Sequence, residues 1–214
     1  NFGCTPTKAV IASAKVAHSA RRAGDYGVLV PAVEIDFAAV LARAKAIVAE
    51  SRAGLEQSLG SVNNLTLLSG HARFVGRDRD RFRLVVGERE VTARTAVLDT
   101  GTRSQIPPIP GLETIDYLTA ENWLDHEALP RHLVIVGGGY IGLEMGQFYR
   151  RMGSEVTVIE SAARIMERED HDVAEAIKQA LEGEGVRFVL GAKAKGFRRE
   201  ADRGLHVVAE DQEA

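Results

Sequence analysis

The segment LVIVGGGYIGLEMGQF (residues 133–148) constrains the fold of this 214-residue chain more than any other. Within it, Gly137, Gly139 and Gly142 form a G-x-G-x-x-G pattern that leaves an apolar run and enters a helical pattern. A second apolar run follows and ends at Glu160. A strand, a glycine turn, a helix and an acidic residue at the end of the next strand together predict a dinucleotide-binding unit.

Each glycine of this turn has a physical task. Gly137 allows the tight turn, Gly139 lets the backbone approach a pyrophosphate, and Gly142 lets the helix lie close to the sheet. The helix N-terminus adds free N–H groups and the positive end of its dipole. A glycine-rich turn without a ligand is the alternative interpretation. The predicted cofactor-binding turn comprises Gly137, Gly138, Gly139, Tyr140, Ile141 and Gly142.

Glu160 bears on the choice of cofactor. A carboxylate at this position accepts hydrogen bonds from the adenosine ribose and repels a 2′-phosphate, which favours NAD over NADP. Arg164 lies nearby in the sequence and leaves NADP open.

Strands and helices alternate beyond residue 131, and the strands are fully apolar. This pattern predicts an α/β fold with a buried parallel sheet. The expected strands cover residues 132–137, 155–160 and 186–190, and the expected helices cover 141–152 and 172–182.

The first half of the chain has a different order. We expect helices over residues 5–22 and 36–59, then short strands over 65–70, 71–76, 81–86 and 95–101. The proline-rich segment 105–112 cannot continue a helix and suits an extended linker. We therefore expect one domain over residues 1–106 and another over 107–214.

A weak internal repeat links the two halves. ARFVGRDRDRFRLVV begins at Ala72 and AKAKGFRREADRGLHVV begins at Ala192. Each has a glycine four positions after its alanine, then Asp-Arg, then Val-Val. Two domains of one topology would produce such a repeat, and two unrelated charged hairpins are the alternative.

Composition excludes several classes of function. The net charge of −3 offers no general attraction to nucleic acid or to an anionic membrane, so neither is expected as a partner. Asp78 and Asp80 interrupt the arginine-rich stretch 77–83. No apolar run approaches the length of a membrane helix. One cysteine cannot form an internal disulfide, which fits the cytoplasm, and no metal site is predicted.

That single cysteine, Cys4, stands where a helix begins, and Lys8 follows in the first turn. A helix N-terminus favours a thiolate but disfavours a lysine. A small buried cysteine and a solvated lysine are the plain alternatives.

The motif GCTPTK resembles the active-site helix of the pyridine nucleotide-disulfide oxidoreductases, in which C-x-x-x-x-C-x-P-x-K carries a redox-active cysteine pair. The resemblance continues through GHARF, LDTGT, IPPIPG, GGGYIGLE and VIESAARIMEREDHDV, and the mercuric reductase-like and dihydrolipoamide dehydrogenase-like branches are nearest. It implies two Rossmann-like FAD- and NAD(P)-binding domains, each with a β-meander. Both domains would be incomplete, because the partner cysteine and the first FAD-binding turn would precede Asn1 and the last strand of the NAD domain would be missing.

The resemblance also implies roles for catalytic residues. Cys4 would be the cysteine nearer the flavin, and Lys8 would approach the flavin and pair with Glu144. Tyr140 would cover the nicotinamide side of the flavin until NADH displaces it.

Three further positions would line FAD, and one would line NAD. Ala72 would contact the FAD adenine region through its backbone, and Thr100 and Gly101 would line the FAD pocket. Ala194 would contact the NAD adenine region through its backbone.

By this resemblance, hydride would pass from NADH to FAD, then to a cysteine pair and on to a small-molecule or metal-ion acceptor. The parent protein would be a homodimer through a further domain that also supplies a His–Glu acid/base pair. Mercuric ion, lipoamide and small disulfides remain open as acceptors. A nucleotide-binding module without turnover of its own is the alternative from another class.

Overall fold

The computed structural model describes residues 3–200 and 204–211, and the outermost ends of both expected domains lie outside this range. The chain forms two compact units. The first unit comprises residues 1–48 and 104–214, and the second comprises residues 49–103. Each is described by itself, and the domain boundary expected at 106 and 107 stays a prediction.

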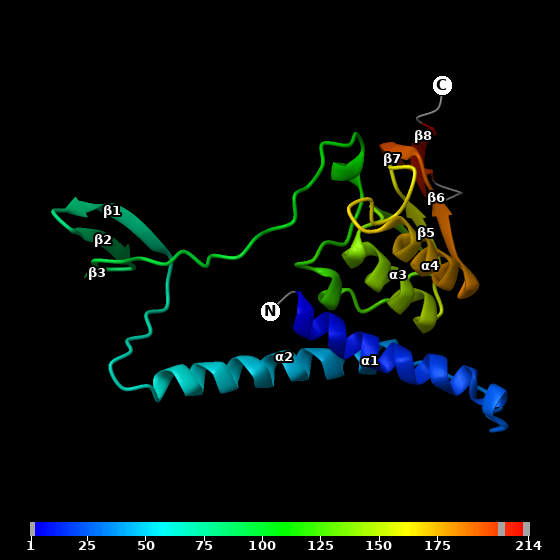
Figure 1. Cartoon of the computed structure of the whole chain (residues 1–214), viewed down its shortest axis with the longest axis horizontal. Coiled ribbons are helices and arrows are strands. Elements are labelled where there is room, and N and C mark those ends of the chain that lie inside the picture. The colour runs from blue at the N-terminus through cyan, green and yellow to red at the C-terminus, as the bar shows by residue number, and fades with distance from the viewer. Residues whose placement is uncertain (1–2, 201–203, 212–214) are drawn as a thin grey trace. The chain divides into compact units, whose positions relative to one another are not determined.

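A parallel three-stranded sheet lies at the centre of the first unit (Figure 1). Its strands are β4 (His132–Val136), β5 (Glu155–Ile159) and β6 (Val186–Val189), in that order. Helices α3 (Tyr140–Met152) and α4 (His171–Gly183) connect them. The predicted α/β class and these five elements are confirmed, with ends that differ by a residue or so.

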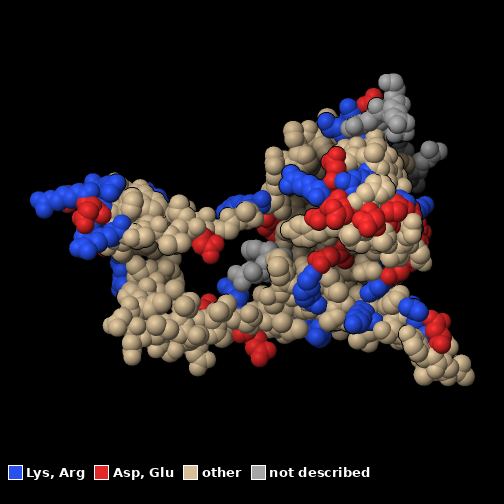
Figure 2. Space-filling model, viewed as in Figure 1, with Lys and Arg blue, Asp and Glu red and all other residues tan. Residues whose placement is uncertain are grey.

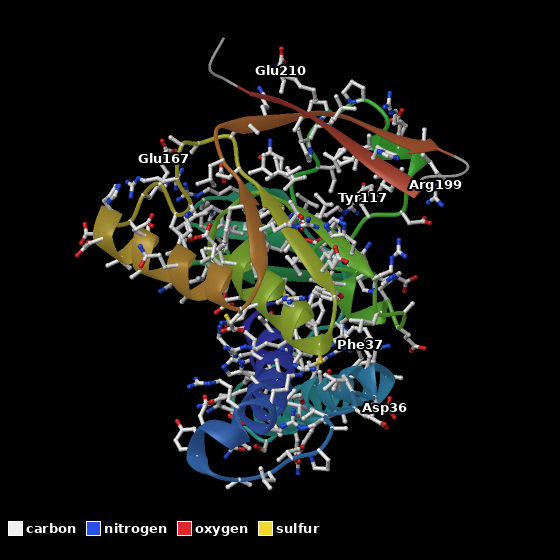
Figure 3. All side chains as sticks on the ribbon, turned by 90° about the vertical axis from the view of Figure 1, so that its right-hand side faces the viewer. Asp36, Phe37, Tyr117, Glu167, Arg199 and Glu210 are labelled. Carbon is white, nitrogen blue, oxygen red and sulfur yellow. The ribbon has the colours of Figure 1, made fainter. Side chains whose placement is uncertain are left out.

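The helix α1 (Cys4–Arg21) lies against α3. Its buried face consists mainly of small side chains, which allow a close approach, and the chain then passes through η1 (Ala23–Tyr26) to α2 (Phe37–Gly60). Phe37, labelled in Figure 3, begins α2. Its ring stacks on that of Phe148 in α3, with the ring centroids 6.0 Å apart. The buried face of α1 comprises Pro6, Ala9, Val10, Ala14 and Ala17.

A cluster of polar side chains joins the C-terminal ends of α1, α3 and α4. Arg151 donates to both carboxylate oxygens of Glu184 at 2.7 and 2.6 Å, and Gln147 donates to the same carboxylate at 2.8 Å. Partial burial raises the pKa of Glu184, but the hydrogen bond and charge of Arg151 together with the hydrogen bond from Gln147 keep the pKa below its usual value. His18 Nδ1 lies 3.8 Å from Glu184, so α1 meets this cluster as well.

The linker after residue 104 is fixed to the first unit by hydrogen bonds. Ser104 donates from its N–H and its hydroxyl to the Glu121 carboxylate, each at 2.7 Å. The Ser104 hydroxyl bond contributes most to lowering the pKa of Glu121 to about 2. Short turns η2 (Leu112–Thr114) and η3 (Trp123–Asp125) follow, and Trp123 is buried. The segment 105–112 does not continue a helix, as expected, but it is not simply extended, because the Ile109 N–H donates to the Pro107 carbonyl and the Leu112 N–H donates to the Ile109 carbonyl.

An antiparallel pair, β7 (Ala192–Glu200) and β8 (Gly204–Asp211), extends the first unit beyond β6. The linker contacts β7 where the Phe197 N–H donates to the Pro110 carbonyl at 2.8 Å. At Gly111 φ is 85°, and an added Cβ would lie 1.9 Å from the Phe197 carbonyl oxygen. Only glycine fits this close approach.

The second unit contains an antiparallel meander of β1 (Ala72–Asp78), β2 (Arg81–Val86) and β3 (Arg89–Ala93). The expected strands over 71–76 and 81–86 are therefore confirmed. Those over 65–70 and 95–101 are wrong, because neither segment pairs with a strand in the described structure. A strand needs a partner for its backbone hydrogen bonds.

The internal repeat has a structural counterpart. The pairing of β1 with β2 shifts register between Phe74 and Gly76, and the pairing of β7 with β8 shifts between Ala194 and Gly196. Each bulge thus occupies the same place in the repeated motif, although the second Asp-Arg pair lies outside the described residues. A shared bulge supports a common hairpin design, and the two-domain interpretation of the repeat stays a prediction.

The described part of the chain contains no helix of the length and apolarity that crossing a bilayer requires.

Replacing Gly111 by alanine should destabilise the chain by roughly 2–4 kcal/mol, because the Cβ would collide with the β7 backbone and alanine disfavours this φ. Urea unfolding followed by circular dichroism measures the change. Gly54→Ala is the control: it meets open space within α2, so it should stabilise by up to about 1 kcal/mol. If Gly111→Ala had the same urea midpoint of unfolding as the wild type, the packing of the linker against β7 would be contradicted.

Candidate nucleotide and redox site

The glycine turn joins β4 to α3 with very little space between backbones. Gly137 has φ of 111°, and its N–H donates to the Ile159 carbonyl at 2.8 Å. A Cβ at Gly142 would lie 2.4 Å from the Gly137 carbonyl oxygen, so a larger residue would push the helix away. The close helix–sheet packing expected of Gly142 is therefore present.

The start of α3 is suited to an anion. Gly139 caps the helix without any side-chain cap, so the first N–H groups of α3 have no intrahelical acceptor. A Cβ added at Gly139 meets nothing within 4 Å, which leaves open space beside these donors. Tyr140 and Ile141, which open the helix, are 67% and 56% exposed and border the same region. Such an arrangement can bind a pyrophosphate.

Glu160 lies at the end of β5 and contacts the turn itself. Gly138 N–H donates to its Oε2 at 2.6 Å, while Ala162 N–H and the Ser161 hydroxyl donate to its Oε1 at 2.8 and 3.1 Å. Partial burial raises the pKa of Glu160, but the hydrogen bonds from Ala162, Gly138 and Ser161 together hold the pKa below its usual value. Glu160 is thus ionised at neutral pH.

Lys8 and Glu144 form an ion pair between two segments far apart in the sequence. The Lys8 ammonium in the second turn of α1 donates to Glu144 Oε1 near the start of α3. The expected contact between these two residues is therefore confirmed. Their side chains are 59% and 37% exposed, so the pair faces solvent or a ligand.

Cys4 is the first residue of α1 and is exposed with a free thiol. The helix is capped by Gly3, so it begins one residue earlier than expected. Cys4 and Lys8 are four residues apart and therefore share one face of α1. The plain alternative of a buried cysteine is wrong for this chain.

Ala194 is buried in β7 at the strand bulge. The start of β7 lies beside Glu160, because the Ala192 N–H donates to the Glu160 carbonyl at 3.0 Å. A buried alanine can offer a ligand only its backbone, as the expected adenine contact requires.

The expected FAD contacts in the second unit are exposed. Ala72 begins β1, while Thr100 and Gly101 lie in the irregular segment after β3. Gly101 has φ of 68°, a conformation that favours glycine. The contribution of these three residues to a flavin site stays a prediction.

Sequence reasoning missed the contacts that surround the glycine turn. Gly138 uses its N–H for Glu160 and its carbonyl for the Met166 N–H, which donates at 3.0 Å. No sequence signal marks such a bond, since every residue except proline carries the same backbone donor.

The model of one protein family, described as pyridine nucleotide-disulphide oxidoreductase, matches residues 1–214. The chain belongs to this family.

Several relatives and solved structures resemble the chain closely. A mercuric reductase of Bacillus cereus is 31% identical over 97% of the chain and 32% of its own length. A dihydrolipoyl dehydrogenase of Cupriavidus necator is 35% identical over 89% of the chain and 40% of its own length. LpdA of Mycobacterium tuberculosis has a TM-score of 0.84 at 27% identity, covering 97% of the chain and 45% of that protein.

A flavoprotein disulfide reductase of Escherichia coli induced by HOCl, RclA, has a TM-score of 0.77 at 28% identity, covering 100% of the chain and 44% of that protein. The chain spans about a third to two fifths of the curated relatives it matches.

Membership of this family implies FAD and a pyridine nucleotide as cofactors. The glycine turn fits a pyridine nucleotide, because it combines uncapped N–H donors with open space at Gly139. Glu160 would hold the adenosine ribose there.

Alanine at Gly139 and at Gly142 should separate binding from folding. Gly139→Ala fills space that only a ligand would occupy, so NADH affinity should fall at least about tenfold while stability changes by at most about 1 kcal/mol. Gly142→Ala should lower both, because its Cβ collides with Gly137. Calorimetric titration with NADH and thermal unfolding measure the two effects. Wild-type affinity in Gly139→Ala would refute a pyrophosphate at this turn.

Proposed function

We propose that this chain carries the junction between the flavin and NAD halves of an NADH- and FAD-dependent disulfide oxidoreductase. When bound, the two cofactors would supply the hydride and electron chemistry that links NADH to a cysteine pair containing Cys4. The observation that carries the proposal is the ion pair between Lys8 of the cysteine-bearing helix and Glu144 of the nucleotide-binding helix.

Stability alone does not explain this ion pair. A lysine near the N-terminus of α1 opposes the helix dipole, and an ion pair this exposed contributes only about 0–1 kcal/mol. Function gives both charges a reason. Lys8 would present a cation where negative charge develops on the flavin, and Glu144 would hold the ammonium in position from the NAD side.

Cys4 would be the cysteine nearer the flavin. Its free thiol is exposed at the start of α1, four residues before Lys8. Tyr140 opens α3 and is exposed enough to move when a nicotinamide approaches.

The ionised Glu160 favours NADH over NADPH as the reductant. Its carboxylate accepts three hydrogen bonds, from Gly138, Ser161 and Ala162, and Oε2 retains a lone pair for a ribose hydroxyl, whereas the carboxylate would repel a 2′-phosphate.

The acceptor is proposed by analogy with the relatives, which include mercuric reductases and dihydrolipoyl dehydrogenases. Mercuric ion, lipoamide and small disulfides are therefore the acceptors to compare. The single cysteine of this stretch suits a reducing compartment, so we place the enzyme in the cytoplasm. The family resemblance, rather than the cysteine, leads us to propose a homodimer.

The proposal is tested on the protein produced from the whole reading frame that contains this chain. It should carry bound flavin and oxidise NADH faster than NADPH with one of the three acceptors. A protein that binds NADH but never reduces flavin would instead be a nucleotide-binding module without turnover.

Lys8→Ala and Glu144→Ala should each slow flavin reduction by NADH about 10- to 100-fold, because the ammonium is lost or displaced from its site. Rapid mixing with NADH and flavin absorbance measure this rate. Lys45→Ala is a matched control, since Lys45 also forms exposed ion pairs, with Asp125 and Glu127, away from the glycine turn. Normal rates in both test variants would exclude the proposed role of the pair.

A further inference from the structure

The loop of residues 161–170, between β5 and α4, holds the glycine turn from outside. Met166 N–H donates to the Gly138 carbonyl, and Ile165 is 1% exposed. The Ile165 side chain lies so close that a Cβ at Gly138 would be 3.1 Å from its Cγ2. This loop therefore fixes the middle residue of the turn.

Arg164 closes this loop. Its Nη1 donates to the Glu169 carbonyl at 2.9 Å, and its Nη2 donates to the Glu167 carbonyl. The label of Glu167 in Figure 3 marks the position of this loop. Met166, between these points, has φ of 47°, which a side-chain-bearing residue rarely adopts unless the surrounding structure holds it there. The planar fork of an arginine is well suited to hold two carbonyls at once.

The alternative role for Arg164 is to bind NADP, because an arginine shortly after the second strand of such a unit can anchor the 2′-phosphate. Arg164 is half-buried and both of its terminal nitrogens are engaged with loop carbonyls. Acidic side chains also gather on the face of the first unit seen in Figure 2, and Glu167, Glu169 and Asp170 are neighbours of Arg164 in the loop. Both features oppose binding of a further phosphate by Arg164.

We propose that Arg164 is a positioning residue that holds the glycine turn in its nucleotide-binding form and does not select between NADH and NADPH. This role rests on the proposed function insofar as the turn binds NADH. Loss of the Arg164 guanidinium would then weaken binding of both nucleotides equally, and Glu160 alone would set the preference.

Amide hydrogen exchange of the chain without nucleotide tests the structural part. Arg164→Ala should speed exchange of the Met166 and Gly138 amides about tenfold, because the loop that orders them is released. Arg168→Ala is the control in the same loop, since Arg168 carries the same charge but its side chain is exposed. Unchanged exchange in Arg164→Ala would overturn the positioning role.

Titration with NADH and with NADPH tests the consequence for binding. In Arg164→Ala both affinities should fall by about the same factor, on the order of tenfold, so that their ratio stays within about twofold of wild type. Arg164→Lys should restore part of both, because one carbonyl can still be reached. A selective loss of NADPH affinity would identify Arg164 as a phosphate anchor and overturn the proposal.

The two readouts also separate this proposal from the proposed function. If the wild-type protein from the whole reading frame bound neither nucleotide, the proposed function would fail, whereas the exchange rates would still decide whether Arg164 holds the turn.

Discussion

Helices α1 and α3 run alongside each other in the same direction, and the candidate site depends on this packing. Lys8 meets Glu144 near the start of both helices, and Arg21 donates to the Arg151 carbonyl near their ends. Small side chains on α1 allow the two helices to approach. The helix that carries the cysteine is thereby placed against the helix that begins at the glycine turn.

The ion pairs at the two ends of α1 and α3 differ in burial. The half-buried Arg151–Glu184 pair at the C-terminal end combines bidentate hydrogen bonds with neighbours on three helices, which suits a structural role. Lys8 and Glu144 at the other end are exposed, so their ion pair adds little stability. The proposed redox site would therefore lie at the N-terminal end of α1 and α3, where the charged side chains contribute least to stability.

Several parts of the fold could be predicted because they follow from local pattern. The strands β4, β5 and β6 are rich in valine and isoleucine, and the glycine turn imposes a tight connection that few other folds use. The segments 65–70 and 95–101 were predicted wrongly as strands, because a strand forms only where a partner is present. Strand β3 was missed because REVTA is short and mostly polar.

The candidate site could be predicted only in part. Glycine spacing and Glu160 are local signals, but the pairing of Lys8 with Glu144 came from family resemblance, since no spacing rule links residues so distant in sequence. The bonds of Gly138 with Glu160 and Met166 depend on where the loop 161–170 folds back, which no short window of sequence contains.

The single cysteine allows a direct test of the central claim, that the cysteine-bearing helix starts beside the nucleotide-binding helix. Cys4 is exposed and can carry a nitroxide label, whose effect on backbone amide signals reports proximity in solution. We predict strong broadening of the amides of Tyr140 to Glu144, with α4 much less affected. Equal and weak broadening of α3 and α4 would contradict the account, because α1 would then not rest on the NAD side of the molecule.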